Sequence, residues 1–497
     1  MDEHTDKPST STAAWSYYKD TLGAPRLVVA PMVEQSELPW RMLSRAHGAQ
    51  LCYTPMIHSS VFIRDATYRQ DFMSNVPEDR PLIAQFCGNN AETLVECTNL
   101  IAPYCNGVDL NLGCPQTIAR KGNYGAFLQD DWAKIYQIVN SVHRLCNVPI
   151  SCKIRVFDDR AKTLEYAKFI EAAGCQILTV HGRTREQKGP NTGLADWDII
   201  RAVKEAVRIP VFSNGNLQLH DDIEQCLQQT GADGVMTAEG NLHNPYLFEP
   251  SAHPCHWQVA REYFTYVDKH PTALSCVRAH LFKLFHHSLL LYPDVRTLLA
   301  NAITMDEMKT VVEKMEQKCK PLHEQYTKDP DSVDIGSLLL PHWLCQPYYR
   351  DSKTSPDAER ASALRAEFRR QNHIALQALH ESTGWSKRRL RRLQRHKTDL
   401  DKLRADETAV TRVVTTYAER RTLARSSYVQ CACGNPIGQK CAVQKCKRCC
   451  KTDCVDEQLN CASHNFWFGD KTELYEIMTE KKKRRKCEDS VEGHEVR

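Results

Sequence analysis

A cysteine stands at the end of a short alternating run in the sequence VDLNLGCPQ, residues 108–116. Val108, Leu110 and Leu112 alternate with polar residues, which is the period of a β-strand, and a glycine and a proline then break the run. The pattern places the Cys114 thiol at the carboxyl end of a strand, where α/β proteins keep their reactive groups. We therefore treat Cys114 as a catalytic candidate, with a buried structural cysteine as the alternative.

Other strand-like runs also end in polar residues or tight turns. A strand that only fills a core needs neither a lysine nor a histidine, although one charged residue at a strand end is weak evidence, since its head group can reach solvent. Seven such ends are harder to dismiss, and we expect them to meet at one opening. They are Pro31-Met32, Gln85, Asn111 with Cys114, Lys153 with Arg155, His181-Gly182-Arg183, Asn214-Gly215-Asn216 and Ala238-Glu239-Gly240.

These residue types suit a flavin mononucleotide (FMN). The small residues of SNGN (213–216) and AEGN (238–241) leave backbone N–H groups open to a phosphate. Gln85 can both donate to and accept from a ring that carries carbonyl and N–H groups. Lys153 offers positive charge to a ring that holds negative charge once reduced, and His181 can reach a phosphate or a substrate carbonyl.

The elements that must position these residues alternate along the chain. Eight strand-like runs, most of them separated by amphipathic stretches of helical length, are typical of a (β/α)₈ barrel. The alternative is an open doubly wound sheet, which usually has fewer strands, and no GxGxxG follows the first run. We predict an α/β fold, a TIM barrel followed by a small helical domain and a C-terminal basic and zinc-binding extension. The runs are 26–32, 49–56, 81–88, 107–114, 149–156, 175–183, 209–216 and 232–238.

The segments APMVEQSELPWR, LNLGCPQ, CKIR, TVHGRT and SNGN, in this order, resemble the tRNA dihydrouridine synthase family, and within it the eukaryotic subfamily acting on uridines 16 and 17 of the D-loop. The resemblance covers residues 25 to about 330. It implies that reduced FMN delivers hydride to C6 of uracil, that Cys114 protonates C5, and that NADPH or NADH reduces the flavin. A thiol suits the acid's role because its unperturbed pKa is about 8.5.

The resemblance also implies roles for the other candidates. Many family members carry Gly-Arg where this chain has Ala238-Glu239, and a glutamate should repel a phosphate unless it turns away. Asn111 would orient the uracil, and Arg155 and Arg183 would contact substrate. The implied flavin contacts are Pro31, Met32 and Val33 along the ring, Gln85 and Lys153 at its polar edge, and His181, Asn214, Gly215, Asn216, Ala238 and Glu239 at the phosphate end.

After the barrel (25–252), residues 253–326 show helical periodicity, and the resemblance implies a tRNA-binding helical domain; a plain helical appendix explains the periodicity equally well. Residues 327–358 are predicted to be a linker and 359–425 a basic helical region. Residues 351–425 hold 18 Lys+Arg against 10 Asp+Glu, a net of 18 − 10 = +8, whereas the whole chain carries +4. Its densest part, WSKRRLRRLQRHK, favours contact with RNA phosphates over a merely solvated helix.

A cysteine cluster follows within 426–470, where eight of the 22 cysteines lie in residues 431–461. Thiolates and imidazole at these spacings can bind tetrahedral Zn²⁺, and disulfides are disfavoured in a reducing compartment. We predict a zinc module with enough ligands for two ions. The candidate ligands are Cys431, Cys433, Cys441, Cys446, Cys449, Cys450, Cys454, Cys461 and His464.

The termini and totals set the remaining expectations. Residues 1–24 are predicted to be a disordered polar tail without a secretory signal, and 471–497 a basic disordered tail whose KKKRRK could direct nuclear import. No run approaches the roughly 18 apolar residues of a membrane span. We expect a cytoplasmic or nuclear protein that binds tRNA, with neither a membrane nor DNA as partner. Two alternatives stay open: an RNA-binding scaffold on a barrel without activity, and an FMN enzyme reducing a free small molecule.

Overall fold

The computed structural model describes residues 10–73, 76–336 and 338–348, together with the single positions 377 and 381. Residues 10–348 lie within one compact unit. The predicted basic helical region, apart from those two positions, and all of the predicted zinc module and basic tail lie outside the described residues.

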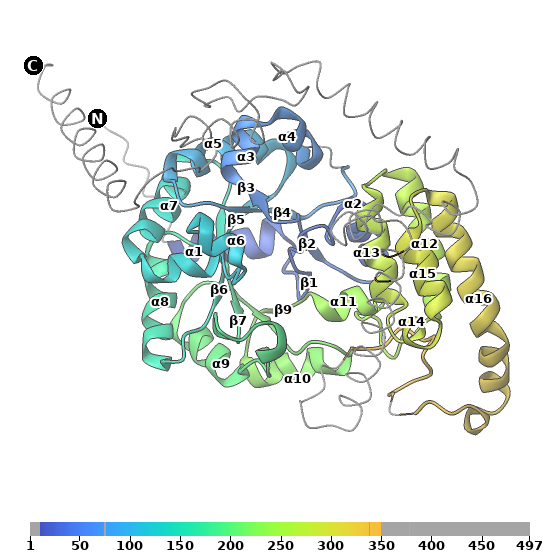
Figure 1. The fold of residues 1–497 in the computed structure, drawn as a ribbon. Helices are drawn as coiled ribbons and strands as arrows, with labels where there is room; N and C mark the ends of the chain where they lie inside the picture. Colours follow the sequence, from blue (N-terminus) through green and yellow to red (C-terminus); the bar gives the residue numbers. More distant parts are fainter. Residues whose placement is uncertain (1–9, 74–75, 337, 349–376, 378–380, 382–497) are drawn as a thin grey trace, which may run out of the picture. The chain divides into compact units, whose positions relative to one another are not determined.

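The barrel strands form a closed parallel ring (Figure 1). Each strand pairs with the next around the ring, β1 pairs with β9 and β2 pairs with β4, so no edge is left between them. A short additional strand, β3 (Ile57–His58), pairs with β4 outside the ring of eight. The TIM barrel prediction is confirmed, and the open sheet is excluded. The eight strands are β1 Leu27–Val29, β2 Leu51–Tyr53, β4 Leu82–Cys87, β5 Gly107–Leu112, β6 Ile150–Arg155, β7 Leu178–His181, β8 Val211–Asn214 and β9 Gly234–Thr237.

Helices surround the ring because each has one apolar face. In α7 the residues Ile135, Ile138, Val139 and Val142 are buried, at the three- and four-residue spacing of a helix face, and the Asp131 side chain caps the first turn. These side chains pack against the outer faces of the strands. The other surrounding helices are α2 Leu38–Ala46, α3 Ser59–Arg64, α4 Ala66–Met73, α5 Ala91–Ile101, α6 Thr117–Gly122, α8 Arg160–Ala172, α9 Trp197–Ala206, α10 Asp221–Thr230 and α11 Glu239–His243.

Alternation along β5 sorts its side chains between the two sides of the barrel wall. Val108, Leu110 and Leu112 belong to the apolar core between strands and helices. Because successive strand residues point to opposite faces, Asp109 and Asn111 face the barrel interior. The strand that leads to the catalytic candidate is therefore apolar outside and polar inside.

The N-terminal segment is ordered from residue 10, so the prediction of a disordered tail over 1–24 is wrong for these residues. Helix α1 (Thr10–Ser16) runs into a π-helical turn at Tyr17–Thr21. Tyr17 and Tyr18 are buried with the interior residues of the barrel, and the Tyr18 hydroxyl donates to the Asp233 carbonyl just before β9. The segment thus packs at the amino ends of the strands, and the burial of its aromatic residues outweighs its polar composition.

In the described part of the chain, five helices follow the barrel, in the range where the sequence predicts helices. Of these, α12 and α13 contact α2, and Trp40 of α2 stacks on His280 of α13 at a ring distance of 3.8 Å. Glu37 accepts from the Tyr263 hydroxyl at 2.6 Å and pairs with His280 at 3.0 Å. The role of these helices in binding tRNA stays a prediction. The helices are α12 His256–Lys269, α13 Leu274–Leu284, α14 Ser288–Leu291, α15 Pro293–Asn301 and α16 Met305–Lys328.

The predicted linker, 327–358, is in part a packed segment, so that prediction is wrong for its described end. Trp343 and Cys345 are buried against the helical domain, and the Cys345 amide donates to the Pro254 carbonyl at 2.9 Å. The enrichment in Asp, Ser and Pro concealed these few anchoring residues. Within the described residues, no helix has the length and apolar character needed to cross a bilayer.

Candidate active site

Cys114 lies two residues beyond the end of β5, in the loop at the carboxyl end of the barrel. Of the thirteen free cysteines in the described residues, only Cys114 and Cys146 are not buried. The Cys114 carbonyl accepts from the Ala126 amide at 3.1 Å, and a β-carbon on Gly125, which has φ +64°, would lie 2.8 Å from that carbonyl oxygen. The loop is closely packed on itself, and Cys114 is partly exposed while it also packs against Cys87, Ala119 and Tyr124. Cys114 is partly exposed, whereas eleven of the thirteen described cysteines are buried, and this difference favours the catalytic candidate.

Asn111 and Gln85 lie beside this loop and are bonded to each other. Asn111 Nδ2 donates to Gln85 Oε1 at 2.8 Å, and Asn111 Oδ1 accepts from the backbone amide of Cys114 at 2.9 Å. Asn111 is 9% exposed and Gln85 is fully buried. The two predicted amides are thus brought together, one at the thiol loop and one deeper in the barrel.

Cationic side chains lie on β6 and in the loop after β7. Burial, followed by the charge of Arg155, lowers the pKa of Lys153 to about 7. Burial, followed by the charge of Arg183, lowers the pKa of Arg155 to about 10. The pKa of His181 is held well below its ordinary value by burial and then by these three cations, so the imidazole is neutral at pH 7. Such a site attracts an anionic ligand.

The two arginines also hold loops together. Arg155 donates to the Gly113 carbonyl at 2.9 Å and to the Thr184 carbonyl at 2.7 Å, which ties the loop after β5 to the loop after β7. Arg183 donates to Asn216 Oδ1 at 2.7 Å and lies 3.0 Å from His181 Nε2. Arg155 and Arg183, both predicted to contact substrate, therefore lie at the mouth of the barrel, where they connect its loops by hydrogen bonds.

The turn after β8 comes close to His181. Gly215 has φ +116°, and a β-carbon there would lie 2.6 Å from Ala195 Cβ and 3.2 Å from the His181 ring, so this position requires glycine. Asn214 accepts a 2.7 Å hydrogen bond from Lys153 and donates another to the Met236 carbonyl. Asn216 has φ +62°, and its side chain bonds to the backbone of Ala195.

Ala238 and Glu239 begin α11 after β9. The Glu239 carboxylate forms an ion pair with Lys283 of α13 at 3.8 Å. This pairing gives the acidic side chain a cationic partner in the helical domain. Glu239 thus joins the turn after β9 to the helical domain.

The predicted flavin-ring residues Pro31, Met32 and Val33 follow β1, and Val33 is 58% exposed. The Ser36 hydroxyl accepts from the Met32 amide at 3.0 Å, and Arg41 donates to the Ser36 carbonyl at 2.7 Å. The loop is thereby fixed from the side of α2.

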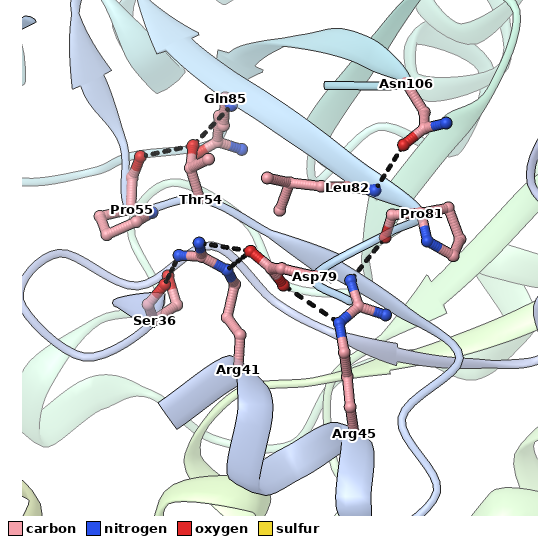
Figure 2. Close-up of polar contacts among 10 residues, drawn as sticks. All are labelled: Ser36, Arg41, Arg45, Thr54, Pro55, Asp79, Pro81, Leu82, Gln85 and Asn106. Carbon is pink, nitrogen blue, oxygen red and sulfur yellow. Dashed lines mark hydrogen bonds and ion pairs between the residues drawn. The ribbon is translucent and has the colours of Figure 1, made fainter. Parts of the chain in front are cut away.

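Figure 2 shows what holds Arg41 in place: it and Arg45 both reach the buried carboxylate of Asp79. Asp79 is fully buried and Arg41 is 5% exposed. Directly after β2, Thr54 Oγ1 accepts from the backbone amide of Gln85 on β4 (Figure 2). Sequence reasoning missed this group, because Asp79 lies 38 residues from Arg41 in a segment without any recognisable motif.

The residues present fit an FMN. A phosphate dianion and an electron-rich ring need cations and N–H donors, and the mouth supplies Lys153, Arg183 and a glycine turn packed against His181.

The predicted zinc ligands lie elsewhere in the chain. Within residues 10–348, apart from the short gaps, no group of three or more His, Cys, Asp or Glu side chains could hold a metal ion. The nine predicted zinc ligands all lie outside the described residues.

Comparison with known proteins agrees with this arrangement. The family profile "Dihydrouridine synthase (Dus)" matches residues 28–331. A Mus musculus protein, "tRNA-dihydrouridine(16/17) synthase [NAD(P)(+)]-like", is 43% identical over 465 residues, which cover 92% of this chain and 91% of that protein. The Schizosaccharomyces pombe "tRNA-dihydrouridine(16/17) synthase [NAD(P)(+)]" is 41% identical over 67% of this chain and 90% of its own length. A Mus musculus "tRNA-dihydrouridine(20a/20b) synthase [NAD(P)+]-like" is 39% identical over only 46% of this chain.

The chain belongs to the dihydrouridine synthase family and is an oxidoreductase. Within the family, its resemblance to proteins named for uridines 16 and 17 extends over nearly its whole length. The resemblance expected from the sequence is therefore confirmed.

Proposed function

We propose that this protein reduces uridine to 5,6-dihydrouridine at positions 16 and 17 of the tRNA D-loop, with bound FMN and with NADPH or NADH as reductant. The observation that carries the proposal is the pairing of an accessible Cys114 with a cationic barrel mouth in a member of this family. When bound, the flavin supplies the hydride for C6 of the uracil.

The chain's own residues supply positioning and a proton. Lys153, His181 and the turn at Asn214–Asn216 hold the negatively charged parts of the cofactor, and the loop at Met32 lines its ring. Asn111 orients the pyrimidine from beside the thiol loop, to whose backbone it is bonded. The Cys114 thiol then gives its proton to C5, and solvent reprotonates the thiolate of this partly exposed residue.

The target base must leave the folded tRNA to reach the barrel mouth. The helical domain lies next to the mouth through the Glu239–Lys283 pair and the α2 contacts, which favours it as one support for the RNA. The basic region and the zinc module, both predicted from sequence, would add contacts to phosphates. A cytoplasmic or nuclear location belongs to the same proposal.

One assay tests the function against its alternatives. Purified protein is incubated with NADPH and either unmodified tRNA or free uridine, and loss of uridine is followed by mass spectrometry of digested RNA. Reduction of tRNA alone, at positions 16 and 17, supports the proposal. Reduction of free uridine at the same rate would indicate a small-molecule reductase, and no FMN uptake together with no reduction would indicate a scaffold.

A further inference from the structure

A buried carboxylate lies in the row of residues that leads to the active site. Asp109 on β5 is 1% exposed, and the barrel register places it between Gln85 on β4 and Ser151 on β6. Its Oδ2 atom accepts from Gln85 Nε2 at 2.8 Å, and its Oδ1 atom accepts from Ser151 Oγ at 2.8 Å. The proposed chemistry assigns no step to this carboxylate, and burying it is costly unless hydrogen bonds such as these two offset the loss of hydration.

A directed chain of hydrogen bonds starts at Asp109. Gln85 donates to the carboxylate and accepts from Asn111 Nδ2 at 2.8 Å, and Asn111 Oδ1 accepts from the backbone amides of Gly113 and Cys114 at 3.1 and 2.9 Å. An ionised carboxylate only accepts, and a backbone N–H only donates. Both ends therefore fix the direction of the hydrogen-bond chain. Rotating the side-chain amide of Gln85 or Asn111 by half a turn would place two donors or two acceptors opposite each other.

The direction of the hydrogen-bond chain decides whether Asn111 presents a donor or an acceptor to a ligand. Two backbone N–H groups occupy Asn111 Oδ1, so the Asn111 side chain keeps one unused N–H and no free acceptor. A donor selects a ligand atom that accepts, such as a carbonyl oxygen. Uracil presents carbonyl oxygens at both C2 and C4, whereas cytosine carries an amino group at C4.

We propose that Asp109 is the positioning residue of this site, which sets the amide orientation of Gln85 and, through Gln85, that of Asn111 and the backbone of the Cys114 loop. The identity of the ligands rests on the proposed function. The orientation itself concerns only residues of this chain.

The surroundings of Asp109 are consistent with an acceptor at working pH. Burial raises the pKa of its carboxyl to about 6, opposed by the hydrogen bonds from Gln85 and Ser151 and by the charge of Lys153. Tyr17 from the N-terminal segment and Tyr53 from β2 also face it, and both stay neutral because burial raises their pKa values. At pH 7.5 the carboxylate is therefore mainly ionised and accepts both hydrogen bonds.

The test compares three variants at pH 7.5. Asp109→Leu removes the acceptor at similar volume. Asp109→Asn keeps one oxygen for Gln85 and can donate to Ser151 Oγ, and Ser151→Ala removes the other partner without touching the amide chain. FMN affinity is measured by quenching of flavin fluorescence, and the rate of Cys114 alkylation by iodoacetamide is measured by peptide mass spectrometry. Circular dichroism establishes that each variant is folded.

We expect Asp109→Leu to weaken FMN binding at least tenfold and to change the alkylation rate of Cys114 at least threefold, while Asp109→Asn and Ser151→Ala stay within threefold of wild type. A folded Asp109→Leu protein that matches wild type in both measurements overturns the inference. If Asp109→Leu does not fold, Asp109→Asn becomes the deciding variant, because it can keep the hydrogen bond from Gln85. Tenfold weaker FMN binding by folded Asp109→Asn would also overturn the inference. A wild-type protein that takes up no FMN counts against the proposed function instead, and the alkylation rates then test the inference alone.

Discussion

The ammonium group of Lys153 on β6 donates a 2.7 Å hydrogen bond to Oδ1 of Asn214 on β8, reaching past the intervening strand β7. Asn214 is itself fixed by its hydrogen bond to the Met236 carbonyl on β9. A cation expected at the cofactor edge is thereby tied to the turn expected at the phosphate end. The two hydrogen bonds join β6, β8 and β9 on the inner surface of the barrel, which is the kind of support that a flat, extended cofactor requires.

This burial makes Lys153 a source of pH dependence. Its pKa falls from 10.5 to about 7 in the fold, so between pH 7 and 10 the unfolded chain binds more protons and stability rises with pH. From pH 7 to 9 the gain is up to about 2 kcal/mol. Chemical denaturation at both pH values should show this increment in wild type and not in Lys153→Met. Equal increments in the two proteins would contradict the assignment.

Replacing Cys114 by alanine should separate cofactor binding from chemistry. The thiol contributes a proton and not a contact to the expected phosphate or ring-edge groups, so the variant should bind FMN within about twofold of wild type. Uridine reduction should fall by roughly 10²–10⁴-fold, the range for loss of a general acid. Cys146→Ala, the other cysteine that is not buried in the described chain, is the matched control and should keep full activity.

Removal of Asp79 should destabilise the barrel strongly. Asp79→Ala leaves Arg41 buried without its carboxylate, and losing one partner of a buried ion pair costs about 3–5 kcal/mol. The control is Glu224→Ala, which breaks an ion pair with Arg26 whose side chains are 61% and 58% exposed, and which should cost less than about 1 kcal/mol. Urea denaturation measures both. Similar losses would show that the network in Figure 2 contributes little.

Gly215→Ala should damage both stability and cofactor binding. The new methyl group would meet Ala195 and the His181 ring at a φ of +116°, and the strain should cost about 2–4 kcal/mol. Gly231→Ala has a positive φ of 64° but no atom within 4 Å of the added carbon, so it isolates the backbone effect at about 1 kcal/mol. FMN affinity should fall only in the first variant. An equal fall in both would remove the special role of the turn.

The zinc module predicted from the sequence should be detectable in the full-length protein. Elemental analysis of protein purified without added metal should give about two Zn²⁺ per chain, because nine candidate ligands can fill two tetrahedral sites. Paired Cys446→Ser and Cys449→Ser substitutions should lower the content by about one ion and weaken tRNA binding, while FMN binding stays unchanged. Less than one Zn²⁺ per wild-type chain would contradict the prediction.

Part of the site could be predicted because the alternation of apolar and polar residues along one strand indicates which side chains face the barrel interior. Cys114 and Asn111 follow from one strand whose polar residues alternate with Val108, Leu110 and Leu112. The same alternation also places Asp109 on the inner face of the barrel, where the structure buries it. Conversely, the polar composition of residues 1–24 concealed the two tyrosines that anchor the N-terminal segment.

By itself, the sequence determined the barrel, the order of its strands and the polar residues at their carboxyl ends, because the periods of strands and helices are local properties of the chain. Only the tertiary structure decided which polar groups meet: Asp79 with two arginines of α2, Asp109 with Gln85, and Glu239 with Lys283. Each pair joins positions far apart in the chain. Closing the barrel and docking the helices on it are what bring such groups within hydrogen-bonding distance, and no local pattern records that geometry.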